Sequence, residues 1–155
     1  MASNRHLGRI IALQTLYEFE FRLASADASA DLDEILARNL ERYEETIDDK
    51  AFVTELVHGA DKDKARLDAI IQPIAPEWPL SQIARIDLVV LRIALYELTS
   101  LGEKVPPKVA INEAVELAKA FGSDNSSKFI NGVLGTAYRT LIEGKAHGGD
   151  ASSQI

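Results

Sequence analysis

Apolar residues recur at steps of three and four along almost the whole chain, and this spacing constrains the fold more than any other feature. It is typical of helices that bury one face. The first such stretch predicts a helix from about Arg5 to Leu23. No segment alternates apolar and polar residues between Gly or Asn turns, so strands are not expected. We therefore predict an all-α protein.

The same spacing predicts five further helices, near residues 32–43, 52–74, 83–98, 109–121 and 127–143. The third of the six helices is expected to be the longest, with Asp48 or Asp49 as its cap. Asp31 is a cap candidate for the second helix, and Gly102 and Gly122 are expected stops. The side chains of the segment 123–126 are expected to cap the last helix.

A proline-rich link divides the predicted helices into two groups. Residues 73–79 hold three of the five prolines and the only tryptophan, Trp78, whose indole is expected to pack between two sub-bundles. We predict one domain over 1–155, with an N-terminal sub-bundle at about 5–75 and a C-terminal sub-bundle at about 80–144. The Gly- and Ser-rich tail 145–155 is expected to be disordered.

Charge and composition narrow the classes of function. The net charge of −7 and the pI near 5.0 argue against a surface that wraps nucleic acid, so any RNA contact must be local. A basic partner could supply the missing positive charge. The chain has no cysteine, no apolar signal block and no apolar run of bilayer length, so we expect a cytoplasmic protein without a membrane segment.

The sequence offers no catalytic constellation. The three histidines, His6, His58 and His147, have no partner at metal-ligand spacing, and no Gly-rich phosphate loop with its lysine is present. We expect no enzyme activity, no metal and no cofactor.

Two sets of residues could bind RNA. Arg5, His6, Arg9 and Tyr17 combine cations with one aromatic ring on the first helix, as single-stranded RNA sites do. Phe121, Lys128 and Phe129 flank the last interhelical turn and could form a second stacking platform. On the residues alone, ordinary core and surface roles are favoured for both sets.

A long and specific signature lies in the C-terminal half of the chain. It consists of the strings VPPKVAINEAVELAK at 105–119, FG at 121–122 and KFINGVL at 128–134. Shorter strings accompany it at 86–87 (ID), 91–98 (LRIALYEL) and 12–17 (ALQTLY). Together, over about residues 5–141, they resemble the NusB family of bacterial transcription antitermination factors.

The resemblance implies two small helical bundles packed into one compact domain. It also implies binding of boxA-type single-stranded RNA in ribosomal RNA leaders, jointly with the ribosomal protein NusE, within an RNA polymerase antitermination complex. Matched by position, the RNA-facing residues are Arg5, His6, Arg9, Tyr17, Phe121, Asn125, Lys128 and Phe129. Asp87 matches an acidic position on the side that faces NusE.

The chain departs from the family pattern at its N-terminus. Family members often begin with an arginine cluster, whereas this chain has only Arg5 and Arg9 beside His6. Gly8 costs up to about 1 kcal/mol relative to alanine in a helix, so this end is expected to fray or to order on binding.

Two alternatives stay open. One is the RNA-targeting domain found in ribosomal RNA methyltransferases, which fits less well because the chain stops at Ile155 without a Gly-rich cofactor unit. The other is a self-associating helical homodimer that binds little RNA alone.

Overall fold

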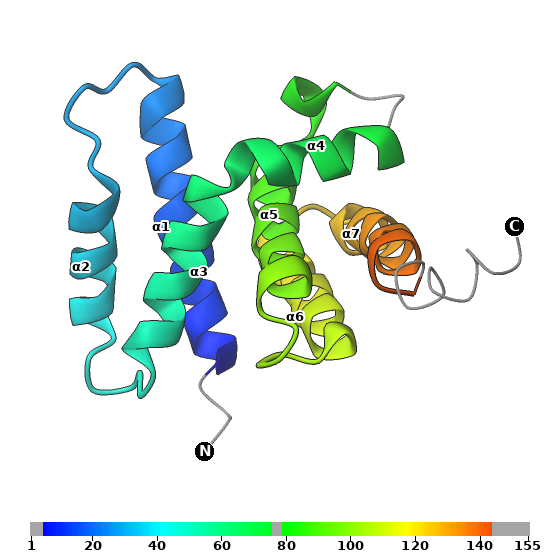
Figure 1. Ribbon diagram of the computed structural model, residues 1–155. Coiled ribbons are helices and arrows are strands. Elements are labelled where there is room, and N and C mark those ends of the chain that lie inside the picture. Colours follow the sequence, from blue (N-terminus) through cyan, green and yellow to red (C-terminus); the bar gives the residue numbers. More distant parts are fainter. Residues whose placement is uncertain (1–4, 76–78, 144–155) are drawn as a thin grey trace, which may run out of the picture. The chain divides into compact units, whose positions relative to one another are not determined.

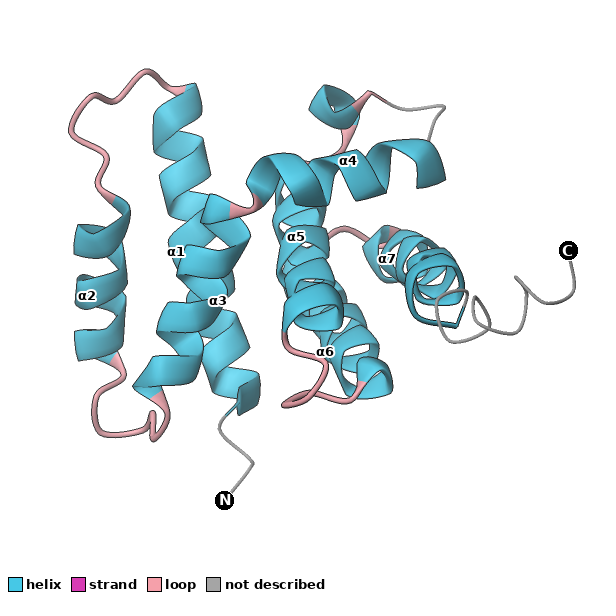
Figure 2. Cartoon of the chain, in the orientation of Figure 1, coloured by secondary structure: helices cyan, strands magenta, loops and turns pink. Residues whose placement is uncertain are grey.

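The computed structural model describes residues 5–75 and 79–143. Within these ranges the chain is helical and has no strand (Figures 1 and 2), which confirms the all-α prediction. The elements are α1 (Arg5–Ala24), α2 (Leu32–Arg42), α3 (Lys50–Lys62), α4 (Lys64–Ile74), the 3₁₀ turn η2 (Leu80–Gln82), α5 (Arg85–Ser100), α6 (Pro107–Phe121), α7 (Ser126–Ala137) and the π-helical segment η3 (Tyr138–Glu143). No helix in the described ranges is long and apolar enough to cross a bilayer.

The chain divides into two compact units between Lys64 and Ala65. The sequence placed the division later, at the proline-rich link, whereas in the structure all of α4 after Lys64 belongs to the second unit. An ion pair joins α4 to α5 within the second unit: Arg92 of α5 donates through Nε and Nη2 to the two carboxylate oxygens of Asp68 on α4, at 2.8 and 2.9 Å. The predictions for Trp78 and for the tail 145–155 lie outside the described residues.

The first unit consists of α1, α2 and α3, which pack on one another. Its core is aliphatic with one phenyl ring, and comprises Ile11, Ala12, Leu13, Leu16, Ile35, Leu36, Phe52, Val53, Leu56, Val57 and Ala60. A buried hydrogen bond of 3.0 Å from the Asn39 amide to the Thr15 hydroxyl joins α2 to α1. Gly8 lies against α3, since a Cβ there would be 3.2 Å from Val53 Cγ2 and 3.3 Å from Phe52 Cδ2.

The predicted helix over 52–74 is wrong as one element, because the helical hydrogen bonding stops at Asp63. The Asp63 N–H makes the last such bond of α3, to the Gly59 carbonyl at 2.9 Å. Asp63 itself has φ −93° and ψ 12°, away from helical values, and α4 begins at Lys64. Among the helices of the described residues, the longest is therefore α1, with 20 residues. The predicted caps are confirmed: the carboxylates of Asp31 and Asp49 accept the N–H groups of Glu34 and Phe52 at 3.1 and 3.0 Å.

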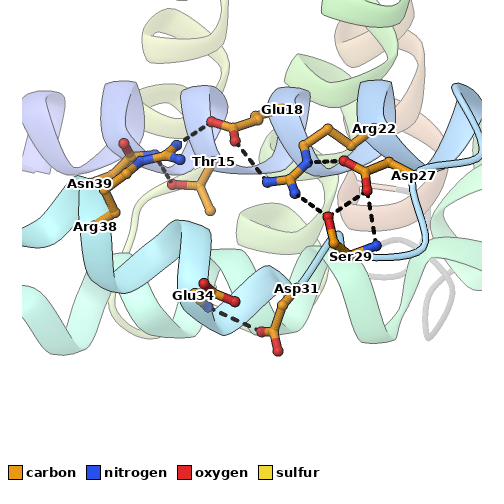
Figure 3. Close-up of polar contacts among 9 residues, drawn as sticks. All are labelled: Thr15, Glu18, Arg22, Asp27, Ser29, Asp31, Glu34, Arg38 and Asn39. Atoms are coloured by element: carbon orange, nitrogen blue, oxygen red, sulfur yellow. Dashed lines mark hydrogen bonds and ion pairs between the residues drawn. The ribbon is translucent and has the colours of Figure 1, made fainter.

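The loop from α1 to α2 is closed by a polar network (Figure 3). The Arg22 guanidinium donates to Asp27 at 2.7 Å, and Asp27 also accepts the Ser29 hydroxyl and N–H at 2.6 and 2.9 Å. These contacts, led by the Ser29 hydroxyl, lower the pKa of Asp27 to about 2. Glu18 accepts from both Arg22 and Arg38, and chiefly Arg38 lowers its pKa. The network ties α1 to the loop and to α2.

The second unit is built on α5, whose buried residues face α6 and α7. Its core includes Val89, Val90, Leu91, Ile93, Leu95, Leu117, Ile130 and Leu134. The predicted stop at Gly122 is confirmed, because the Gly122 N–H donates to the Ala118 carbonyl at 2.9 Å where α6 ends. In this unit the α6–α7 turn lies beside the first turn of α5.

Candidate nucleic-acid interface

All four N-terminal candidates lie on α1, in the first unit. His6 is exposed, Arg5 and Tyr17 are half-buried, and Arg9 is only 2% exposed. Tyr17 lies twelve residues after Arg5, which is roughly 18 Å along a helix axis. The four side chains therefore form an extended row and not one compact cluster.

Arg5 and Arg9 share one aromatic partner. Their guanidinium carbons lie 4.8 and 5.2 Å from the centre of the Phe52 ring on α3, within cation–π range. Phe52 is 5% exposed, so both arginines help to hold α1 on α3. The burial of Arg9 had a signal in the sequence: Leu13 and Leu16 follow it at steps of four and seven, on the core face. Its contact with RNA stays a prediction.

An aromatic pair occupies the other end of α1. The rings of Tyr17 and Phe21 stack with centroids 6.5 Å apart and planes 17° apart, and Phe21 is 50% exposed. The sequence singled out Tyr17 as a candidate but not Phe21. Together they offer a flat surface of the kind on which bases stack.

The C-terminal candidates surround the α6–α7 turn. Phe121 is 40% exposed at the end of α6, Asn125 and Lys128 are exposed, and Phe129 is half-buried in the first turns of α7. Neither phenylalanine is fully buried, so neither is an ordinary core anchor. The turn presents aromatic, amide and cationic groups within nine residues.

The turn is shaped by contacts that exclude a side chain at Gly122. A Cβ there would lie 2.5 Å from Ser126 Oγ and 2.8 Å from the Ala118 carbonyl oxygen. The Ser126 hydroxyl in turn accepts the Ser123 N–H at 2.9 Å. The prediction that side chains of the segment 123–126 cap α7 is wrong, because the N-cap residue Asn125 makes no side-chain cap bond. The Ser126 hydroxyl holds the turn that precedes the helix instead.

A cavity of about 260 Å³ joins Asp87 to this turn. Asp87, Asn125 and Phe129, three residues singled out from the sequence, all line it. Asp87 is 8% exposed, and its Oδ1 atom is buried without a hydrogen-bond partner. The cavity is completed by Gln82, Ile83, Ala84, Ser123 and Ser126, which carried no signal of a site in the sequence.

Phe121 and Lys128 do not line the cavity. Within the described ranges, no group of three or more His, Asp or Glu side chains is placed to hold a metal ion. The candidate residues therefore form a binding surface beside the cavity that contains the Asp87 carboxylate.

The family profile described as NusB matches residues 6–139 of the chain. The chain belongs to the NusB family. A relative from Roseiflexus castenholzii, described as transcription antitermination protein NusB, is 49% identical and covers 93% of this chain and 100% of its own length. A NusB from Dehalococcoides mccartyi, strain CBDB1, is 39% identical, with 92% and 95% covered.

Solved NusB structures share the fold. NusB of T. maritima is 34% identical, with a TM-score of 0.76 over 90% of this chain and 93% of that chain. A structure described as antitermination factors NusB and NusE in complex with dsRNA has a TM-score of 0.76 at 22% identity, covering 91% and 100%. These matches confirm the predicted NusB-like fold and the predicted class, a transcription antitermination factor and not an enzyme.

Proposed function

We propose that the chain is an antitermination adaptor that binds boxA-type RNA of ribosomal RNA leaders together with NusE. The observation that carries this proposal is the family match over 6–139, with relatives described as transcription antitermination proteins. The solved NusB–NusE complex with RNA supports both partners. The adaptor would act in the bacterial cytoplasm, within the RNA polymerase antitermination complex. Matches along nearly the full length of these relatives favour it over the methyltransferase module.

We propose that the α6–α7 turn makes the principal contact with RNA. Phe121 and Phe129 can stack on bases, Lys128 can hold a phosphate, and the Asn125 amide can donate and accept hydrogen bonds. Three of these four side chains are exposed, and all come from one short segment that is fixed at Gly122 and Ser126.

We propose that the row of side chains on α1 makes a second contact with RNA. His6 and the half-buried Arg5 lie in the first turn of the helix, and Tyr17 stacks on Phe21 further along it. Arg9 lies behind this row on Phe52, so we propose that it acts mainly by holding Arg5 and α1 in place.

Charge explains the need for NusE. A chain of net charge −7 repels RNA at long range, and few cations line either proposed contact. A basic partner on the same RNA would offset this repulsion. We expect NusE to raise the affinity for boxA-type RNA, measured by fluorescence anisotropy with and without NusE over a range of salt concentrations. Absence of a NusE complex at micromolar concentrations would contradict the adaptor proposal.

Two substitutions test the site assignment. Tyr17→Ala and Phe129→Ala should each weaken RNA binding by about 1–3 kcal/mol, the usual contribution of one base stacked on an aromatic ring. Circular dichroism should show that both variants fold. Val109→Ala removes an apolar side chain that is 42% exposed on α6, outside both proposed contacts, and should bind RNA normally. Unchanged binding in both test variants would remove the assignment.

A further inference from the structure

We infer that the bound RNA continues from the α6–α7 turn along the exposed side of α7, where Arg139 holds a second phosphate beyond the one at Lys128. This inference rests on the proposed function, because it assumes that RNA reaches Lys128. It adds a residue outside both proposed contacts and lengthens the RNA segment that the chain binds.

The helix α7 and most of η3 lie in the longest stretch of the chain without negative charge. The chain has 24 acidic residues, but none lies between Asn125 and Ile142. The charged side chains of this stretch are Lys128 and Arg139 alone. Residues 1–17, which carry the proposed contact on α1, form another long stretch without acids. Because carboxylates repel phosphates, an acid-free helix in an acidic chain favours a polyanion as its ligand.

Both cations of this stretch are available to a ligand. Lys128 and Arg139 are exposed, and neither has a carboxylate partner among the described residues. The Arg139 guanidinium donates from Nη2 to the Thr136 hydroxyl at 3.2 Å. Its other N–H groups can hold the two free oxygens of a phosphate, the geometry that arginine prefers. By contrast, Arg92 on α5 is held by Asp68.

The two cations lie on one side of the helix, with two glycines between them. Gly132 and Gly135 follow Lys128 after four and seven residues, and Arg139 follows it after eleven. Residues at such steps lie on the same side of a helix. A Cβ at Gly135 would lie 3.5 Å from Arg139 Nη1, whereas a Cβ at Gly132 would meet nothing within 4 Å. We call these four residues the α7 row.

The spacing of the α7 row suits the backbone of one RNA strand. Eleven residues span roughly 16 Å along a helix axis, so Lys128 and Arg139 would hold different phosphates. The glycines let the strand lie close to the helix between the two cations, because they add no side chain. The segment η3 follows α7 directly (Figure 1), so no loop interrupts this path.

The test compares a labelled boxA-type RNA with the same RNA extended by a uridine tract at its 5′ end or at its 3′ end. Binding is measured by fluorescence anisotropy with the full chain and NusE over a range of salt concentrations. We expect one of the extended RNAs to bind up to about fivefold more tightly, the effect of one exposed ion pair. In Arg139→Gln this gain should vanish. The slope of log affinity against log salt should fall by about 0.7, the contribution of one phosphate contact.

Matched variants separate phosphate binding from other effects. Arg139→Lys keeps the charge and should keep the slope. Arg42→Gln removes an exposed arginine from α2, outside the α7 row, and should bind the extended RNAs normally. Gly132→Glu places a carboxylate in open space between the two cations and should weaken binding of the extended RNA. The isosteric Gly132→Gln should weaken it less.

Each outcome decides between the inference and the proposed function. An unchanged slope for both extended RNAs in Arg139→Gln overturns the inference, and leaves the proposed function intact if the boxA-type RNA binds. If Arg139→Gln instead abolishes the complex with NusE, the α7 row binds protein and the inference is wrong. If Arg139→Gln fails to fold, equal binding by the two Gly132 variants overturns the inference. If no RNA binds with NusE present, the proposed function itself fails.

Discussion

Gly8 is a helical glycine, and its lack of a side chain allows α1 to pack closely on α3. Its backbone lies against Phe52 and Val53, so a methyl group there would be at 3.2–3.3 Å from both side chains. The Phe52 ring is held under two guanidinium groups and is buried, which leaves it little room to move. The glycine thus permits the contact between α1 and α3.

Gly8→Ala should therefore lower the stability of the chain, although alanine is the better helix former. Overpacking costs about 1–3 kcal/mol, which outweighs the roughly 1 kcal/mol gained in helix propensity. Urea unfolding followed by circular dichroism measures the net effect. Gly132→Ala is the matched control, because Gly132 is helical and exposed and a Cβ there meets nothing within 4 Å. It should stabilise by up to about 1 kcal/mol, and a gain of the same size at Gly8 would contradict the packing argument.

At the scale of elements, the loop from α1 to α2 depends on an ionised carboxylate. The pKa of Asp27 is about 2 in the folded chain, below its ordinary value of 3.8. Because its pKa is lowered on folding, the ionised Asp27 carboxylate stabilises the fold at pH values above 3.8. This contribution is lost as the pH falls from 3.8 toward about 2. The loop is expected to loosen in acid.

Asp27→Asn should lower the urea midpoint at neutral pH, and the difference from the unaltered chain should shrink as the pH falls through this window. Ser29→Ala removes the contact that lowers the pKa most and should reproduce part of the effect. A difference that stays constant down to the lower end of the window would show that the carboxylate charge is not the cause.

The sequence predicted the helices whose apolar spacing is unbroken, such as α1 and α5. It missed the end of α3, because the segment 61–64 contains only charged residues that suit either a helix or a turn. In the site, it predicted Asp87, Asn125 and Phe129 individually. Their common cavity was not predictable, because Asp87 and Asn125 meet only through the packing of α5 on α6 and α7. A local pattern carries no information on that packing.

At the scale of the whole molecule, net charge governs the encounter with partners. A chain of charge −7 should associate with a basic protein at a rate that falls steeply with salt. We expect the association rate with NusE, measured by stopped-flow fluorescence, to fall by about tenfold between low and high salt. The dissociation rate should change less, because it depends mainly on the buried contacts. An association rate independent of salt would contradict electrostatic attraction.

The cation–π contacts of Arg5 and Arg9 with Phe52 affect how genetic data on this chain are to be interpreted. A library screen scored on RNA binding would report Arg9 as a binding residue, since its loss removes a cation of α1 and one of the two cation–π contacts with the Phe52 ring. The same screen scored on cellular abundance would report it as a folding residue. Variants depleted in both screens mark the inner layer of α1, whereas those depleted only for binding mark the surface that touches RNA.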